Sequence, residues 1–398
     1  MTAREVGDGE ARAERLATSL TNRLVREGVI LDHRWRDALH AQPRHHFVDA
    51  FHEPGEPGEP GGSWRETATD AATFLPTIHS GRTVVTALSP LDPWGRQVPV
   101  SIAPPVDLLI TGLQALDLFD GADVLELGTG TGHTTALLSE RLGDGHVTSV
   151  DIDPDLHHTA ARHLHARDLH PTLLVGDSAS PSARTEYDRV IVEHEVPTVP
   201  PSWVALVRPG GSLLVRVTGG LSAGGHVLLR RPDSGEPVLS GRFLAWGGPL
   251  APHRAPARRL FVRRPPEPVA DGARPCSSPF SPSALTDGGA LALLMQLMLP
   301  PGVQAQRRAS GDTTWATYLR GADGSWAEIS HELGRTGLYD VRWAGNLRLL
   351  SAVEHAHDLW HRLGTPPLTA FGITAGTDGA RVWHDSADAG TWWPLRAA

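Results

Sequence analysis

The chain has 398 residues, 40% of them hydrophobic and 20% charged, so it is long enough for two domains and can bury apolar cores. Its formal net charge of -9 at pH 7 argues against nucleic acid as a partner, because binding to a phosphate backbone needs a positive surface. The single cysteine, Cys276, excludes an intrachain disulfide and any multi-cysteine metal site.

The N-terminal residues contain no apolar stretch of the kind found in secretory signals. No run in the sequence approaches the length needed to span a bilayer. We therefore expect a cytoplasmic protein with no membrane partner.

Two helices are predicted near the N-terminus. Leu16, Leu20 and Leu24 recur every four residues, which indicates an amphipathic helix over residues 10–26. A second helix over residues 32–41 ends before Pro43, since the residue before a proline disfavours helical geometry. We expect these helices to form an N-terminal cap.

From about residue 104, strands and helices alternate. Buried strands are expected at 123–127, 146–151, 172–175, 188–192 and 212–217, and helices at 106–118, 134–142 and 155–166. This alternation predicts the α/β class, with a Rossmann-like, doubly wound parallel sheet. Hairpin-like strands at 226–229 and 238–246 would add an antiparallel edge.

The composition changes over residues 263–282, which are rich in proline, arginine and serine and are therefore predicted to form a linker. The linker would separate residues 1–262, the cap and Rossmann-like sheet, from residues 283–398. We expect the second segment to form a smaller C-terminal α+β domain.

A glycine-rich turn follows the first buried strand of the expected sheet. Gly128, Gly130 and Gly132 have GxGxG spacing, and such a turn brings the backbone close to a ligand at the start of a helix. His133 stands where a dinucleotide-binding fingerprint would have its third glycine. Glu126, just before the glycines, fits an S-adenosylmethionine site, in which a carboxylate meets the ammonium group of the ligand.

Acidic residues also follow the next two strands. Asp151 ends the second strand, where a carboxylate can accept hydrogen bonds from both ribose hydroxyls. Asp177 follows the third strand and could accept from the adenine amine, with Ser178 as a neighbouring polar contact. Together with the glycine turn, these residues predict a nucleoside site.

Several further segments resemble protein-L-isoaspartate O-methyltransferases. These are Gln42-Pro-Arg-His-His-Phe-Val, Tyr187-Asp-Arg-Val-Ile-Val, Val196-Pro-Thr-Val-Pro-Pro-Ser-Trp and Val207-Arg-Pro-Gly-Gly-Ser-Leu-Leu-Val. The resemblance extends over roughly residues 16–248. It implies S-adenosylmethionine as the cofactor and methyl transfer to a carboxylate.

The sequence departs from that family at the expected substrate site. The active-site serine of the family falls at Ile102, and Ser101 is displaced by one position. Ser101 is still the hydroxyl donor that we expect at the reacting carboxylate. Glu193 and His194 replace a small-residue stretch of the family and are expected, with Ser101 and Ile102, to contact the substrate.

The end of the chain resembles methyltransferases encoded beside ATP-grasp peptide cyclases. The similar segments are Leu368-Thr-Ala-Phe-Gly-Ile-Thr, Val382-Trp383 and Trp393-Pro394-Leu395. This resemblance implies a ribosomally made, crosslinked precursor peptide (a graspetide) as the substrate. An aspartate side chain would be methylated, the ester would then collapse to an aspartimide, and the C-terminal domain would recognise the peptide.

Two other functions remain open. One is an isoaspartate-repair carboxyl methyltransferase that acts on damaged proteins; the displaced serine and the added domain count against it. The other is a non-catalytic module that only binds the cofactor. An oxidoreductase is disfavoured by the GxGxG spacing.

No metal site is expected from the 21 histidines. The pairs His45-His46 and His157-His158 have no carboxylate or cysteine nearby in the sequence at the spacing of metal ligands.

Overall fold

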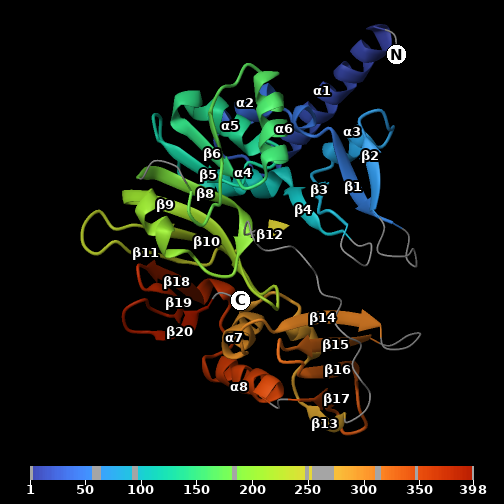
Figure 1. The fold of residues 1–398 in the computed structure, drawn as a ribbon, viewed down its shortest axis with the longest axis vertical. Helices are drawn as coiled ribbons and strands as arrows, with labels where there is room; N and C mark the ends of the chain where they lie inside the picture. Colours follow the sequence, from blue (N-terminus) through green and yellow to red (C-terminus); the bar gives the residue numbers. More distant parts are fainter. Residues whose placement is uncertain are drawn as a thin grey trace.

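The computed structural model describes residues 3–55, 64–91, 97–181, 186–246, 251–252, 273–309, 315–345 and 348–396. The described residues form three sheets: the cap sheet lies beside the parallel part of the large sheet, and the third sheet lies at the opposite end of the molecule (Figure 1). None of the described helices is long and apolar enough to cross a membrane.

The N-terminal cap contains both helices and a sheet. Its helices are α1 (Ala3–Arg26), α2 (His33–Ala41), the short 3-10 helix η1 (Arg44–Phe47) and α3 (Phe74–Ile78). The strands β1 (Ala50–Pro54), β2 (Trp64–Ala68), β3 (Val84–Leu88) and β4 (Pro99–Ala103) pair antiparallel in the order β2-β1-β3-β4. The two predicted helices are confirmed, but the sequence prediction of a helical cap missed this sheet.

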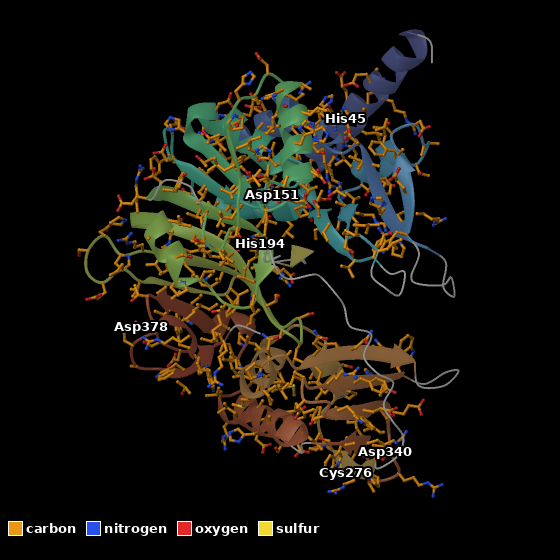
Figure 2. The ribbon with its side chains drawn as sticks, viewed as in Figure 1. His45, Asp151, His194, Cys276, Asp340 and Asp378 are labelled. Carbon is orange, nitrogen blue, oxygen red and sulfur yellow. The ribbon has the colours of Figure 1, made fainter. Side chains whose placement is uncertain are left out.

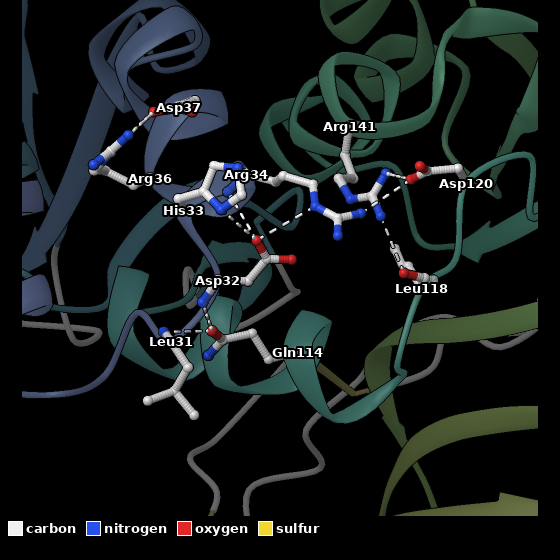
Figure 3. Close-up of polar contacts among 10 residues, drawn as sticks. All are labelled: Leu31, Asp32, His33, Arg34, Arg36, Asp37, Gln114, Leu118, Asp120 and Arg141. Atoms are coloured by element: carbon white, nitrogen blue, oxygen red, sulfur yellow. Dashed lines mark hydrogen bonds and ion pairs between the residues drawn. The ribbon is translucent and has the colours of Figure 1, made fainter.

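Apolar and polar contacts fix the cap to the central domain. Leu20, Leu24 and Trp35 are buried in one cluster with residues of the central helices. Gln114 Oε1 accepts hydrogen bonds from the backbone N–H of Leu31 at 2.7 Å and of Asp32 at 3.2 Å (Figure 3). The position of the cap over the sheet is therefore determined by contacts between segments far apart in the chain.

The large sheet has the expected parallel part. Its parallel strands are β5 (Val124–Leu127), β6 (Val147–Asp151), β7 (Thr172–Val175), β8 (Tyr187–Val196) and β9 (Val207–Thr218). They pair in the order β9-β8-β5-β6-β7, so the chain reverses its winding direction at β5 and β8. The helices are α4 (Val106–Ala115), α5 (His133–Leu142) and α6 (Pro154–His165), with 3-10 turns η2 (Asp144–His146) and η3 (Pro201–Leu206).

The antiparallel edge of this sheet extends further than the sequence predicted. It begins with β10 (Gly224–Arg230) and β11 (Leu239–Arg242) and continues through β18 (Phe371–Gly376), β19 (Gly379–His384) and β20 (Thr391–Leu395). The two-residue strand β12 (Ala251–Pro252) pairs with β8. The last strands of the chain therefore belong to the large sheet.

The remaining C-terminal residues form a separate antiparallel sheet flanked by helices. Its strands, in the order β13-β17-β16-β15-β14, are β13 (Arg274–Ser278), β14 (Gln304–Ala309), β15 (Trp315–Arg320), β16 (Trp326–Leu333) and β17 (Tyr339–Ala344). The helices are α7 (Ala290–Met298) and α8 (Arg348–Arg362), with short turns η4 (Pro282–Leu285) and η5 (Leu368–Ala370).

The expected domain boundaries need correction. Residues 263–272 of the predicted linker lie outside the described residues, but residues 274–278 form strand β13, and Phe280 is buried. Residues 371–395, which we assigned to the C-terminal α+β domain (283–398), hydrogen-bond to the large sheet through β11. One apolar cluster also continues from Trp203 in the central domain to Val353 on α8. The sequence missed this arrangement because it depends on long-range strand pairing.

Candidate functional site

A pocket lies where the carboxyl ends of β5, β6 and β8 face strand β4 of the cap. The open space in and in front of this pocket amounts to about 790 Å³, part of it open to solvent. Asp151 and His194, both on its lining, are labelled at this junction in Figure 2. Ligands bind at such a position in doubly wound sheets, because the loops diverge where the winding direction reverses.

The pocket has two walls of different origin. The sheet wall consists of Gly128, Gly130, Asp151, Ser178, Glu193 and His194. The cap wall consists of Arg44, Ser101 and Ile102. His133, at the start of α5, also lines the pocket and contacts the cap at the carbonyl of Gln42. The lining thus includes eight of the eleven predicted site residues: Ser101, Ile102, Gly128, Gly130, Asp151, Ser178, Glu193 and His194. Glu126, Gly132 and Asp177 lie outside it.

The glycine turn is built as the sequence predicts. Gly130 has φ +53°, and its N–H donates to Asp151 Oδ2 at 2.8 Å. A Cβ at Gly130 would lie 3.5 Å from Ser101 Oγ, so the turn passes directly in front of the cap wall. Gly132 has another role, because a Cβ there would lie 3.2 Å from Ala160 on α6. Gly132 allows helix packing, whereas Gly130 approaches the pocket.

The two predicted nucleoside carboxylates differ in position. Asp151 is buried in the pocket lining, and its Oδ1 accepts from the backbone N–H of Asp153 at 3.0 Å. Asp177 lies outside the lining, and its Oδ1 accepts from Ala179 N at 2.9 Å, within its own turn. Ser178 does line the pocket, and its carbonyl accepts from Trp203 Nε1 at 2.6 Å.

Two carboxyl groups lie beside the glycine turn, Glu126 fully buried and Glu193 partly exposed in the pocket lining. Glu126 is fully buried behind the lining; its Oε2 accepts from Thr135 Oγ1 at 2.5 Å, and its Oε1 accepts no hydrogen bond from the described residues. Burial, and to a smaller extent the charge of Glu193, raises the pKa of Glu126 to about 8, and the hydrogen bond from Thr135 opposes this rise. Loss of water around Glu193, which lines the pocket, raises its pKa to about 7.

The hydroxyl of Ser101 faces the glycine turn from β4. Ser101 is buried, and its Oγ accepts a hydrogen bond from Thr86 Oγ1 at 2.8 Å. Since Thr86 supplies the proton of that bond, the O–H of Ser101 remains able to donate to a ligand. Ile102, its neighbour, also lines the pocket and gives this wall an apolar patch.

Arg44, for which the sequence predicted no role, lines the pocket from the cap side. Its guanidinium is buried and donates to the carbonyls of Ala103 at 2.6 Å and Arg82 at 3.0 Å, which fixes the end of β4. Burial lowers the pKa of Arg44 to about 10. Arg44 belongs to the segment beginning at Gln42 that resembles isoaspartyl methyltransferases, and this resemblance could have pointed to it. Its contact with β4 could not be predicted, because the two residues lie 59 positions apart.

His133, whose role the sequence left open, anchors the cap. Its Nε2 lies 3.1 Å from the carbonyl of Gln42, and its ring lies 5.2 Å from that of Phe47. Burial lowers the pKa of His133 to about 3, so the ring is neutral and its Nε2 carries the proton that it donates.

The part of the chain that is similar to known proteins contains most of the pocket lining. The family model described as Protein-L-isoaspartate(D-aspartate) O-methyltransferase (PCMT) matches residues 95–230, which include β4, the glycine turn and β8. This part of the chain is isoaspartyl methyltransferase-like.

Individual relatives agree with that match. A protein-L-isoaspartate O-methyltransferase of Methanothrix thermoacetophila is 37% identical over 105 residues, covering 26% of this chain and 50% of that protein. One of Hyperthermus butylicus is 29% identical over 209 residues, covering 50% of this chain and 73% of that protein. The chain spans about half the length of the first of these relatives.

A solved structure of a protein-L-isoaspartate O-methyltransferase aligns with a TM-score of 0.51 at 18% identity. The alignment covers 93% of this chain and 100% of the other. It supports the α/β methyltransferase fold predicted from the sequence.

Proposed function

We propose that this chain is an S-adenosylmethionine-dependent methyltransferase that esterifies a carboxylate. The observation that carries the proposal is the meeting of the glycine turn, Asp151 and Ser101 around one pocket. The similarity of residues 95–230 to carboxyl methyltransferases supports it independently.

The residues of the sheet wall fit the cofactor. The missing side chain at Gly130 leaves room beside Asp151, whose carboxylate is suited to the ribose hydroxyls. Ser178 would contact the adenine, with Asp177 holding its turn in place. The unsatisfied Oε1 of Glu126 suits the ammonium group, reached through water because Glu126 lies behind the lining. When bound, the cofactor supplies an electrophilic methyl group.

The cap wall would orient the substrate carboxylate. A carboxylate is ionised at pH 7, so the protein needs no general base and has mainly to align the reacting oxygen. The Ser101 hydroxyl is a neutral donor and holds this oxygen without the strong trapping that a free cation would impose. Arg44 is already engaged with backbone carbonyls.

The substrate that we propose is an aspartate side chain in a ribosomally made, ATP-grasp-crosslinked peptide. The resemblance of residues 368–374 and 393–395 to methyltransferases of that pathway supports this choice, as does Ile102 at the serine position of the repair enzymes. After methylation, the next backbone nitrogen would attack the ester carbonyl. The new N–C bond closes the aspartimide, and methoxide leaves with the amide proton as methanol.

Isoaspartate repair is the second candidate. The names of the relatives favour it, and the solved methyltransferase aligns over 93% of this chain, so the added C-terminal region alone does not distinguish the two functions.

Intact-mass analysis would separate these functions. The protein and S-adenosylmethionine would be incubated with an isoaspartyl peptide and, separately, with a crosslinked precursor that contains aspartate. Methylation of the precursor alone, followed by loss of methanol to a net loss of one water, is the expected result. Methylation of the isoaspartyl peptide alone would establish repair. Cofactor binding without reaction of either peptide would point to a binding module.

A further inference from the structure

A cluster of side chains that could bind a metal ion lies outside the pocket, where the N-terminal half of α1 meets η1. Glu10 projects from α1, and His45 and His46 belong to η1, 35 residues further along the chain. Figure 2 shows His45 at this junction. We propose that Glu10, His45 and His46 form a binding site for one divalent zinc ion. The proposal is independent of the proposed methyl transfer.

The distances within the cluster fit shared coordination better than hydrogen bonding. Glu10 Oε1 lies 3.5 Å from His45 Nε2 and 3.7 Å from His46 Nε2. Charge-assisted hydrogen bonds are shorter, about 2.8 Å. Ligands on a tetrahedral zinc ion, with bonds of about 2.1 Å, lie about 3.4 Å apart. One ligand atom from each residue lies within 4.8 Å of the others, so small side-chain rotations would close the triad on an ion.

A fourth residue supports the ring of His45 from behind. His45 Nδ1 lies 3.0 Å from His79 Nε2. If Nδ1 carries the proton of this contact, the lone pair of His45 Nε2 points toward Glu10. Zinc-bound histidines are typically oriented in this way, with the second ring nitrogen donating to a neighbour. His79 is buried, so this contact fixes the ring plane before any ion arrives.

The surroundings allow an ion to enter and balance its charge. The side chain of His45 is only 6% exposed, whereas that of Glu10 is 52% exposed, so one side of the cluster is open to water. Glu14, one helical turn after Glu10, places a second carboxylate within electrostatic range of His45. Arg167 opposes these charges, but its guanidinium is held by Gln42 Oε1 at 3.1 Å. Two carboxylates thus lie near the proposed ion to offset its charge, and Arg167 opposes them.

Three protein ligands leave the fourth position for water. The cluster lies outside the pocket of the proposed methyl transfer, so we expect the ion to support the fold of the cap. An ion there would fasten α1 to η1, the turn that carries Arg44 into the cap wall. We therefore expect zinc to stabilise the cap.

The test is a zinc titration of the tag-free, chelator-treated full chain by calorimetry, with thermal unfolding measured in parallel. We expect one equivalent to bind and the melting temperature to rise. Glu10→Gln and His46→Ala should each weaken binding about 100-fold or more, since even the loss of a supporting residue costs about 10–100-fold. Cobalt added in place of zinc should give the visible absorption of a tetrahedral site in the wild type alone.

Two control variants test whether the measured zinc binds to histidines outside the proposed site. His40→Ala removes an exposed histidine of α2, and His357→Ala breaks the contact between His357 and His361 on α8. Both should bind zinc as the wild type does. Circular dichroism checks the fold of each variant, and Glu10→Gln alters a half-exposed side chain, so the test does not depend on the more buried histidines. The proposal fails if the wild type binds no zinc, or if Glu10→Gln and His46→Ala bind it unchanged.

Discussion

On both sides of the pocket, burial favours the neutral form of ionisable side chains, but it shifts the pKa values of acids and histidines in opposite directions. On the sheet side, burial raises the pKa of Glu126 to about 8 and that of Glu193 to about 7, which favours protonated carboxyl groups. Behind the cap wall, burial lowers the pKa values of His79 and His133 to about 3, which favours neutral imidazoles. Desolvation disfavours the charged form of either group.

Two charged groups are exceptions to this pattern. Asp151 in the sheet wall is stabilised by N–H donors from Gly130 and Asp153, and Arg44 in the cap wall by backbone carbonyls. Each wall therefore retains one charge that hydrogen bonds support, and each of these charges fixes a backbone segment. In this pocket, an ionised side chain is therefore found where its hydrogen bonds also hold a backbone segment of a wall in place.

Asp151→Ala should have the largest effect on cofactor binding. The substitution removes the acceptor for Gly130 N and the proposed ribose contact. Two charged hydrogen bonds of about 1.5 kcal/mol each correspond to about a 100-fold loss of affinity. Calorimetric titration with S-adenosylmethionine measures this loss of affinity. Asp155→Ala, at an exposed position at the start of α6, is the control and should bind the cofactor as the wild type does. Unchanged affinity in Asp151→Ala would contradict the assignment of the sheet wall.

Arg44→Met should destabilise the cap wall. The carbonyls of Ala103 and Arg82 lose their donor in a buried setting, which we expect to cost about 2 kcal/mol of unfolding free energy. Urea unfolding measures this loss. Arg36→Met, at an exposed position of α2, should change stability little. If the two variants are equally stable, Arg44 does not support the wall.

The two walls should also respond to pH with opposite sign. A buried acid with a raised pKa stabilises the fold below its unfolded value of about 4.5, and this stability is lost as pH rises through the folded pKa. Glu126 and Glu193 should therefore lower the free energy of unfolding between about pH 5 and 8. The histidines are protonated more readily in the unfolded chain, so their contribution rises with pH between about 3 and 6.5.

Glu126→Gln separates the two contributions. It should flatten the decline above pH 5 by about 1.4 kcal/mol or more, the equivalent of one pKa unit, and leave the rise at lower pH unchanged. Urea unfolding from pH 4 to 8.5 checks this, with Glu140→Gln on α5 as the control. The same decline in Glu126→Gln and the wild type would mean that another group causes it.

The sheet wall could be predicted from the sequence, whereas the cap wall largely could not. Glu126, Gly130 and Asp151 lie at or just after the carboxyl ends of strands whose order in a doubly wound sheet is set by local strand–helix alternation. The cap sheet has short strands joined by long connections, and its pairing has no local signal of that kind. The pairing of β11 with β18 was missed for the same reason, because these strands lie far apart in the chain.

For individual site residues, too, the local position could be predicted from the sequence, whereas contacts between distant segments could not. Asp177 was placed correctly at the end of a strand, yet its side chain caps its own turn outside the pocket lining. His45 and His46 showed no neighbouring carboxylate in the sequence, because Glu10 reaches them only through the packing of α1 on η1. A sequence pattern predicts which strand end a residue occupies, and packing then determines where its side chain points.

The smallest predicted effect concerns Ser101, where the two walls meet. Ser101→Ala removes one neutral donor at the proposed substrate carboxylate, which should lower kcat about fivefold, or about 1 kcal/mol, with cofactor affinity unchanged. Thr86→Val removes only the bond that orients Ser101 Oγ, so its effect on kcat should be smaller still. Single-turnover methylation, followed by intact mass, measures both. A larger loss in Thr86→Val than in Ser101→Ala would assign the contact to β3 and would remove Ser101 from the reaction.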